Sequence, residues 1–221
     1  MNRLTVLLAD DHTIVRQGLR AILDAEPDLE VVGEVSDGRE AVQAVTTLRP
    51  SVVVMDVAMP GLNGIEATRQ IVSQADAPRV IMLSMYADIE HVLHALDAGA
   101  SGYVRKQDAD SELVAAVRTG RPGNPFLSPA IDRELLEEHR RRAELQAGPE
   151  AEPYEPLTPR EREVLQLVAE GRANKQIASI LGIAVRTVEA HRASIMRKLN
   201  ISDQASLVRY AVRKGVVPID E

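Results

Sequence analysis

The stretch LTVLLADDH, residues 4–12, joins an apolar run of strand length to a pair of aspartates. Three later apolar runs also end at a polar side chain, at Asp56, Ser84 and Lys106. These runs are apolar on both faces and alternate with helix-length segments, which predicts a parallel sheet built from βαβ units. The carboxyl ends of parallel strands share one edge of the sheet, where ligands bind. The sequence therefore predicts that the aspartate pair and the three later side chains meet at that edge.

The first 120 residues are expected to form a doubly wound α/β domain with a five-stranded parallel sheet, a flavodoxin-like arrangement with right-handed crossovers. Its expected strands are rich in β-branched and aliphatic residues and lie at residues 4–9, 30–35, 52–56, 80–84 and 102–104. Its expected helices carry apolar residues at helical spacing and lie at residues 13–23, 39–48, 64–73, 89–98 and 111–118. The full length of 221 residues leaves room for a second core.

Residues 121–155 are expected to be a linker that contains a charged helix. Clusters of glycine and proline at residues 120–125 and 148–153 mark its two breaks. Between them, residues 131–145 carry apolar positions at roughly helical spacing behind Ser128, which suits a helix N-cap. This helix either packs on a domain or a partner chain, or serves as a solvated spacer, and the sequence leaves both alternatives open.

Residues 156–221 predict a small all-α domain of four helices. The first helix begins at TPRE, residues 158–161, which is a capping box with proline at the first helical position. The other three helices end at or near a glycine or a turn residue and are expected at residues 174–181, 185–199 and 203–214. Because a tight turn at residues 182–184 joins two of them, the sequence predicts a helix-turn-helix.

Charge divides the chain into an acidic front and a basic back. The net charge is −8 over residues 1–120, −3 over residues 121–155 and +4 over residues 156–221. A basic unit is a candidate for a polyanionic partner, although so small an excess also fits ordinary scatter. The absence of cysteine excludes disulfides, thiolate metal sites and a cysteine nucleophile. No apolar stretch has the length of a signal-peptide core or a membrane span, so a cytoplasmic protein without a membrane partner is expected.

The predicted group of carboxylates suits a hard divalent cation. Asp10, Asp11 and Asp56 repel one another unless a cation lies among them, and all-oxygen donors favour Mg²⁺ or Mn²⁺. An aspartate beside such a metal can accept a phosphoryl group, while Ser84 donates a hydrogen bond to it and Lys106 neutralises its charge. The competing explanation for any one residue is an aspartate that caps a helix or a solvated lysine. Five such residues at matching strand ends favour the phosphoryl site.

Four motifs of the first half resemble a two-component response-regulator receiver domain over about residues 3–120: LADDH at 8–12, MDVAMPGLNG at 55–64, LS at 83–84 and GYVRK at 102–106. The resemblance implies that Asp56 is the phosphoacceptor. It also implies that Mg²⁺ is held by Asp10, Asp11, Asp56 and the backbone carbonyl of Ala58.

A switch pair, Ser84 and Tyr103, follows from the same resemblance. Phosphorylation would draw Ser84 inward and let Tyr103 rotate into the space, which changes the face near the last helix and strand. Many receivers have proline after the lysine, which supports a cis peptide bond. Here Gln107 follows Lys106, which leaves the isomer of that bond open.

Motifs of the second half look like a LuxR-type helix-turn-helix: LTPREREVL at 157–165, NKQIA at 174–178, TVEAHR at 187–192 and KL at 198–199. Joined to a receiver, this arrangement is similar to the NarL/FixJ family over nearly the whole chain. The resemblance implies that the helix at residues 185–199 enters the major groove of double-stranded DNA, with Glu189, Ala190 and Ala193 at base edges.

The full set of expected DNA contacts is polar, basic or small and lies on or near that helix: Lys175, Arg186, Thr187, Glu189, Ala190, His191, Arg192, Ala193, Arg197 and Lys198. Phosphate contacts, which position the protein without reading sequence, are expected from Lys175, Thr187, His191, Arg192 and Lys198. The competing explanation for each arginine is a solvated helix face, and His191 has packing as its alternative.

The last expected helix is expected to expose the apolar residues Leu207, Val208, Ala211 and Val212. In the family it resembles, this helix pairs two DNA-binding domains, which implies a homodimer on two-fold related half-sites. The alternative is that these residues close the small core.

Together these features predict a DNA-binding response regulator of a two-component system. A sensor histidine kinase phosphorylates Asp56, which controls dimerisation and transcription-factor activity, with RNA polymerase as a further partner. A rival phosphohydrolase would need a general acid just after the nucleophile, but Val57 and Ala58 follow it, so no more than slow self-dephosphorylation is expected. The other alternative is a constitutive DNA-binding regulator whose non-phosphorylated receiver serves dimerisation.

Overall fold

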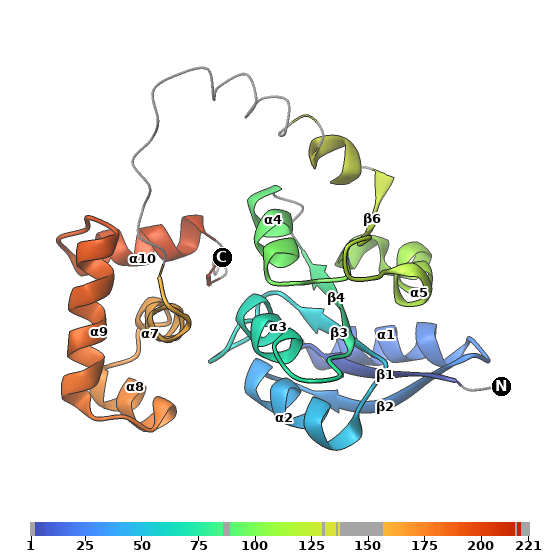
Figure 1. Ribbon diagram of the computed structural model, residues 1–221, viewed down its shortest axis with the longest axis horizontal. Helices are drawn as coiled ribbons and strands as arrows, with labels where there is room; N and C mark the ends of the chain where they lie inside the picture. The colour runs from blue at the N-terminus through green and yellow to red at the C-terminus, as the bar shows by residue number, and fades with distance from the viewer. Residues whose placement is uncertain are drawn as a thin grey trace. The chain divides into compact units, whose positions relative to one another are not determined.

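The computed structural model describes residues 3–85, 89–129, 131–135, 137, 157–214 and 216–217 (Figure 1). The chain divides into two compact units, residues 1–148 and residues 149–221. The domain boundaries expected at residues 120 and 155 stay predictions. Residues 136 and 138–145 of the expected charged helix lie outside the described residues. In the part of the chain that the structure describes, no helix is long and apolar enough to cross a membrane.

The first unit is built on one sheet in the strand order β2-β1-β3-β4-β5-β6. Every neighbouring pair of strands is parallel. The strands are β1 (Leu4–Ala9), β2 (Leu29–Val35), β3 (Val52–Asp56), β4 (Arg79–Ser84), β5 (Gly102–Arg105) and β6 (Phe126–Leu127). The first five strands confirm the predicted parallel α/β fold, and their ends lie within one residue of the expected positions.

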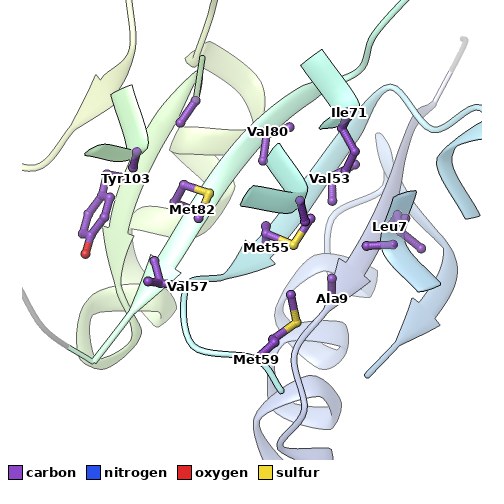
Figure 2. Close-up of a cluster of buried hydrophobic side chains, with 14 of the residues drawn as sticks. Leu7, Ala9, Val53, Met55, Val57, Met59, Ile71, Val80, Met82 and Tyr103 are labelled. Atoms are coloured by element: carbon purple, nitrogen blue, oxygen red, sulfur yellow. The ribbon is translucent and has the colours of Figure 1, made fainter. Parts of the chain in front are cut away.

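Helices cover both faces of this sheet (Figure 1). Side chains of α1 (Thr13–Asp24) and α5 (Ala109–Thr119) share one core with Val6 and Leu8 of β1. The opposite core holds Leu7 and Ala9 together with side chains of α2 (Gly38–Leu48), α3 (Gly64–Val72) and α4 (Ile89–Asp97). Successive residues of β1 thus enter opposite cores, as the alternation of side chains along a strand requires. Figure 2 shows part of the second core, including Met55, Met82 and Tyr103.

The short strand β6 and the residues after it complete the first unit, and the sequence does not predict this strand. In β6, Phe126 pairs with Gly102 and Leu127 with Tyr103, so the β5 edge is covered. Residues 131–135 are helical, and Ile131 is 1% exposed within the core that contains Tyr103. Of the two alternatives left open for the charged segment, its described beginning therefore packs on a domain.

The second unit consists of α7 (Pro159–Ala169), α8 (Asn174–Leu181), α9 (Val185–Lys198) and α10 (Gln204–Arg213), which confirms the predicted helical domain. The capping box of α7 forms in both directions between Thr158 and Glu161. Gly182 ends α8 in the left-handed conformation, φ 63°, which glycine adopts without strain and which allows the tight turn into α9. All four helices contribute to one aliphatic core.

Helix α10 faces the core with residues that were expected to form a dimer contact. Leu207 and Ala211 are both 0% exposed and pack with the other helices, so the expectation that they are exposed is wrong. The period of the helix places residues four apart on the same face, and here that face is the inner one. Val208 and Val212 are half-buried.

Candidate functional site

The carboxyl edge of the sheet gathers the side chains expected there. Asp10 follows β1, Asp56 ends β3, Ser84 ends β4 and Lys106 follows β5. Because these four strands are consecutive neighbours in the sheet, residues far apart in the chain are brought to one place. Asp10, Asp56 and Ser84 are buried, so the polar groups at this edge must satisfy one another or a ligand.

Lys106 links the two buried carboxylates. Its Nζ atom lies 2.7 Å from Oδ2 of Asp10 and 2.8 Å from Oδ2 of Asp56. Both contacts are ion pairs by distance, yet neither Oδ2 atom has a hydrogen-bond partner of good geometry among the described residues. Two carboxylates beside one ammonium leave an uncompensated negative charge in a buried place.

The pKa of Asp56 is raised to about 6. Burial is the main cause, and the nearby charge of Asp10 adds to it, whereas Lys106 and the backbone N–H of Ala58 oppose it. For Lys106, burial lowers the pKa, but Asp56 and Asp10 more than offset this and the net direction is upward. The lysine is therefore a cation at neutral pH. Burial destabilises the ionised form of Asp56, and a second cation nearby would stabilise that form.

Asp11 and His12 complete the acidic cluster at its exposed side. One ligand atom from each of Asp10, Asp11, His12 and Asp56 lies within 4.8 Å of the others. His12 Nδ1 lies 2.7 Å from Oδ1 of Asp11 and 3.4 Å from Oδ1 of Asp10. His12 was not expected in this cluster, although its place directly after the aspartate pair was a usable signal.

The loop after β3 holds Asp56 in place through its backbone. The N–H of Val57 donates to the carbonyl of Leu83 at 2.9 Å, and the N–H of Gly64 donates to the carbonyl of Val57 at 2.9 Å. A Cβ atom on Gly64 would lie 1.9 Å from the carbonyl oxygen of Asp56. Only glycine permits this close approach, which brings the start of α3 against the end of β3. Ala58, whose carbonyl is the expected metal ligand, lies in this loop and is half-buried.

The expected switch pair occupies neighbouring strands. Ser84 is 3% exposed at the end of β4, and Tyr103 is 0% exposed on β5. Tyr103 lies in the core with Met82, which is its partner in the β4–β5 register. No peptide bond among the described residues is cis, so the bond from Lys106 to Gln107 is trans.

Helix α9 presents most of the expected DNA contacts on its exposed face. Five of these contacts are exposed and lie one, three or four positions from the next, so they share one face of the helix: Arg186, Glu189, Ala190, Ala193 and Arg197. Thr187 is exposed as well, and so is Lys175 at the beginning of α8. The face therefore exposes arginines, the carboxylate of Glu189 and small side chains, which are groups that can contact bases or phosphates.

Three other expected contacts are half-buried: His191, Arg192 and Lys198. Arg192 donates to Oδ1 of Asn174 at 2.7 Å and to Oε1 of Gln204 at 3.0 Å, so it links α8, α9 and α10. Lys198 Nζ lies 2.9 Å from Oε2 of Glu161, and both side chains are buried or nearly so. A phosphate contact from Lys198 would require this ion pair to break.

Comparisons with known proteins agree with both units. Residues 6–118 match the response regulator receiver domain, and residues 155–211 match the bacterial regulatory proteins of the luxR family. The chain is 41% identical over 212 residues to transcriptional regulatory protein LiaR of Bacillus subtilis (strain 168), covering 96% of this chain and 98% of that protein. It is 40% identical over 213 residues to oxygen regulatory protein NreC of Staphylococcus carnosus (strain TM300), covering 96% and 98%.

Solved structures of response regulators are similar over nearly the whole chain. The RcsB response regulator of Salmonella typhimurium matches with a TM-score of 0.65 and 29% identity, covering 97% of this chain and 99% of that one. An RcsB–DNA complex matches with a TM-score of 0.57 and 29% identity, covering 95% and 98%. The chain therefore belongs to the NarL/FixJ family of two-component response regulators, in which a receiver domain precedes a LuxR-type DNA-binding domain.

Proposed function

We propose that Asp56 accepts a phosphoryl group from a sensor histidine kinase and that this modification controls dimerisation and DNA binding. The observation that carries the proposal is the contact of one ammonium, that of Lys106, with the buried carboxylates of Asp10 and Asp56 at 2.7 and 2.8 Å. With Asp11 included, three carboxylates and one lysine leave an excess of two negative charges. A divalent cation balances that excess and brings a phosphoryl group to the same edge.

Mg²⁺ is the proposed cofactor, and Mn²⁺ is expected to replace it. The donor chemistry fits, since the carboxylates of Asp10, Asp11 and Asp56 and the carbonyl of Ala58 are all oxygen ligands. The Oδ2 atoms of Asp10 and Asp56, buried without well-formed hydrogen bonds among the described residues, support the same assignment. When bound, the ion would neutralise phosphoryl oxygens and align the donor with the acceptor.

The proposed reaction is a phosphoryl transfer from a phosphohistidine to Asp56. A carboxylate oxygen of Asp56 forms the new O–P bond as the P–N bond breaks, and the imidazole nitrogen keeps the electron pair and is protonated on leaving. Lys106 stays protonated and moves its charge toward a phosphoryl oxygen, while the hydroxyl of Ser84 donates to another. Because Asp56 has a pKa of about 6, it is mostly the required carboxylate at neutral pH.

This chemistry makes the protein a phosphoryl acceptor rather than an enzyme with turnover. Val57 and Ala58 follow Asp56, so no side-chain acid stands beside it in sequence to activate a water molecule. Only slow self-dephosphorylation is proposed. The alternative of a constitutive regulator with a non-phosphorylated receiver is not favoured. A buried pair of like charges destabilises a module that serves dimerisation alone.

The output is proposed to be a shift in population toward a homodimer that binds double-stranded DNA. Exposed residues of α9 would enter the major groove, with Glu189, Ala190 and Ala193 at base edges. Thr187 of α9 and Lys175 of α8, both exposed, would contact phosphates. On α10, Val208 remains the apolar candidate for pairing. The RcsB–DNA complex supports DNA as the partner. Contact with RNA polymerase and action in the cytoplasm belong to the same proposal.

A labelling experiment tests the acceptor. The full chain is incubated with phosphoramidate and Mg²⁺, and its intact mass is measured. We expect the mass of one phosphoryl group on the wild type, none on Asp56→Asn, and loss of the label from wild type when the metal is chelated beforehand. An unmodified wild type, under conditions that label another receiver domain, contradicts the proposal.

A selection experiment tests the output. Duplexes that the protein retains are recovered from a random DNA pool with and without phosphoramidate. We expect two related half-sites and stronger enrichment after phosphorylation. Equal enrichment in both samples would support the constitutive alternative instead.

A further inference from the structure

Helix α9 packs on the core of its domain through one apolar face. Of its 14 residues only Val188 and Ile195 are buried. They lie seven positions apart, about two turns, and the half-buried Val185 and Met196 pack against the same core. Apolar contacts are non-directional, so they hold this face inward without fixing the exact rotation of the helix. The rotation of α9, which decides which residues face DNA, is therefore expected to depend on directional polar contacts as well.

A buried carboxylate supplies these contacts. Glu161 of α7 is 4% exposed, and both of its oxygens accept hydrogen bonds. The backbone N–H of Thr158 donates to Oε2 at 2.8 Å, and the hydroxyl of Ser194 donates to Oε1 at 2.7 Å. Lys198 Nζ donates to Oε2 at 2.9 Å. Ser194 and Lys198 lie one turn apart on α9, so the carboxylate binds a full turn of this helix from a neighbouring one.

We propose that Glu161, Ser194 and Lys198 form a clamp that sets the rotation of α9 against α7. In this clamp Lys198 is a positioning residue rather than a phosphate contact. The clamp is assigned within the proposed DNA-binding function and rests on it. If Lys198 moved to a phosphate, Glu161 would keep a buried charge without this cation, which is strongly unfavourable. The ammonium of Lys198 therefore stabilises the protein more as the partner of Glu161 than as a phosphate contact.

Two matched lysine variants test the clamp in the full chain. The probes are a duplex selected from a random pool by the wild type and a scrambled duplex of the same length, each titrated at several salt concentrations. Lys175→Met removes an exposed lysine, so we expect the slope of log affinity against log salt to fall by about 0.9 with the preference for the selected duplex retained. Lys198→Met should keep the wild-type dependence of log affinity on log salt. Its preference for the selected over the scrambled duplex should fall about tenfold.

The opposite pattern overturns the clamp. If Lys198→Met lowers the salt slope as Lys175→Met does and keeps the preference, Lys198 is a phosphate contact. A role in stability alone would lower the folded fraction but leave the preference of the folded protein unchanged, and this outcome also overturns the proposal.

If Lys198→Met does not fold, the variant Glu161→Gln tests the clamp in its place. The amide retains the size of the side chain but loses the charge. The clamp predicts a weaker preference and no loss of salt slope. If Glu161→Gln keeps the full preference for the selected duplex and binds it as tightly as the wild type or more tightly, Lys198 contacts DNA once it is released from Glu161. This result would reject the clamp.

A measurement without DNA separates this inference from the proposed function. Hydrogen exchange of the α9 backbone amides is compared in wild type, Glu161→Gln, Lys198→Met and the double variant. A clamp predicts that the double variant exchanges no faster than the faster single variant, whereas additive effects would contradict it. A wild type that binds no duplex would end the proposed function but leave this comparison valid.

Discussion

Lys106 Nζ lies 2.8 Å from Oδ2 of Asp56, in a place where both side chains are less than a tenth exposed. Lys106→Met removes the cation and leaves Asp56 and Asp10 facing each other. Removal of one partner from a buried ion pair costs about 3–5 kcal/mol, so we expect the free energy of unfolding of the first unit to fall by about 3 kcal/mol. Urea denaturation in the presence of a chelator measures this.

The double variant Lys106→Met, Asp56→Asn is the control for that effect. Because it also removes one of the two buried charges, it should recover part of the lost stability. A single variant Lys106→Met as stable as the wild type would show that the ion pair contributes little.

The metal site can be tested through Asp11 and His12, whose side chains lie 2.7 Å apart. Asp11→Asn removes a proposed ligand charge and should weaken Mg²⁺ binding at least tenfold. His12→Ala removes only a neighbour that competes for Asp11, so its affinity should equal or exceed that of the wild type. The rise in melting temperature with added Mg²⁺ reports both affinities. Weaker binding in His12→Ala would instead make His12 a ligand.

Gly64 and Gly18 form a matched pair for the approach of α3 to the site. A Cβ on Gly64 would lie 1.9 Å from the carbonyl oxygen of Asp56, so Gly64→Ala must displace the backbone there. We expect phosphoramidate labelling of Asp56 to slow at least tenfold. A Cβ atom on Gly18, which lies inside α1, would meet no heavy atom within 4 Å.

Gly18→Ala should therefore leave labelling unchanged and stabilise the first unit by about 0.5–1 kcal/mol, through the better helix propensity of alanine. Rates of mass increase and urea midpoints are compared for both variants. Equal labelling of Gly64→Ala and the wild type would mean that the loop relaxes without moving Asp56.

The carboxyl of Glu161 makes the second unit sensitive to acid. Burial raises its pKa, but the hydrogen bonds from Thr158, Ser194 and Lys198 outweigh burial and lower the pKa from 4.5 to about 2. A carboxyl with a lowered pKa stabilises the fold above its ordinary pKa, and this contribution is lost as the pH falls from 4.5 toward 2.

The loss should amount to about 3 kcal/mol when complete. Exchange protection of the α9 amides in the wild type should decrease over this range of pH, after correction for the intrinsic exchange rate. Glu161→Gln, which cannot titrate, should show a smaller decrease. Identical pH profiles for the two proteins would mean that other carboxyls determine acid stability.

Ile131 joins the beginning of the charged segment to the core of the first unit, where it is 1% exposed. Ile131→Ala should create a cavity and cost about 2–5 kcal/mol of stability. Glu134→Ala, at an exposed position of the same helical segment, should change stability by less than about 0.5 kcal/mol. Urea denaturation compares the two, and equal midpoints would mean that the Ile131 side chain is not anchored in solution.

The sequence predicts the parts of the fold that repeat a clear pattern. The apolar run of β3 ends at Asp56 in the structure as it does in the prediction, because fully buried strands have an unmistakable composition. The strand β6 has two residues, too few for any periodicity to appear. Burial of Ile131 depends on its packing in the core that contains Tyr103, which is a tertiary property that no local pattern contains.

The residues of the candidate site were likewise predictable where a local pattern places them and not where tertiary packing does. Lys106 was expected beside the carboxylates because strand ends converge, and the structure brings it there. Leu207 and Lys198 were expected outside, but one closes the core and the other pairs with Glu161. A helical pattern identifies faces but not which face turns inward, and that choice was decided by the neighbouring helices.

The short strand β6 has a practical consequence for exchanging parts between relatives. A fusion joined at Gly120 would remove β6 and leave the amides and carbonyls of β5 as an open edge, which is a template for unwanted association between chains. It would also leave a hollow at the place of Ile131. A junction after Glu137 keeps both elements with the sheet. The position of the junction in such a hybrid therefore decides whether the β5 edge stays covered or invites aggregation.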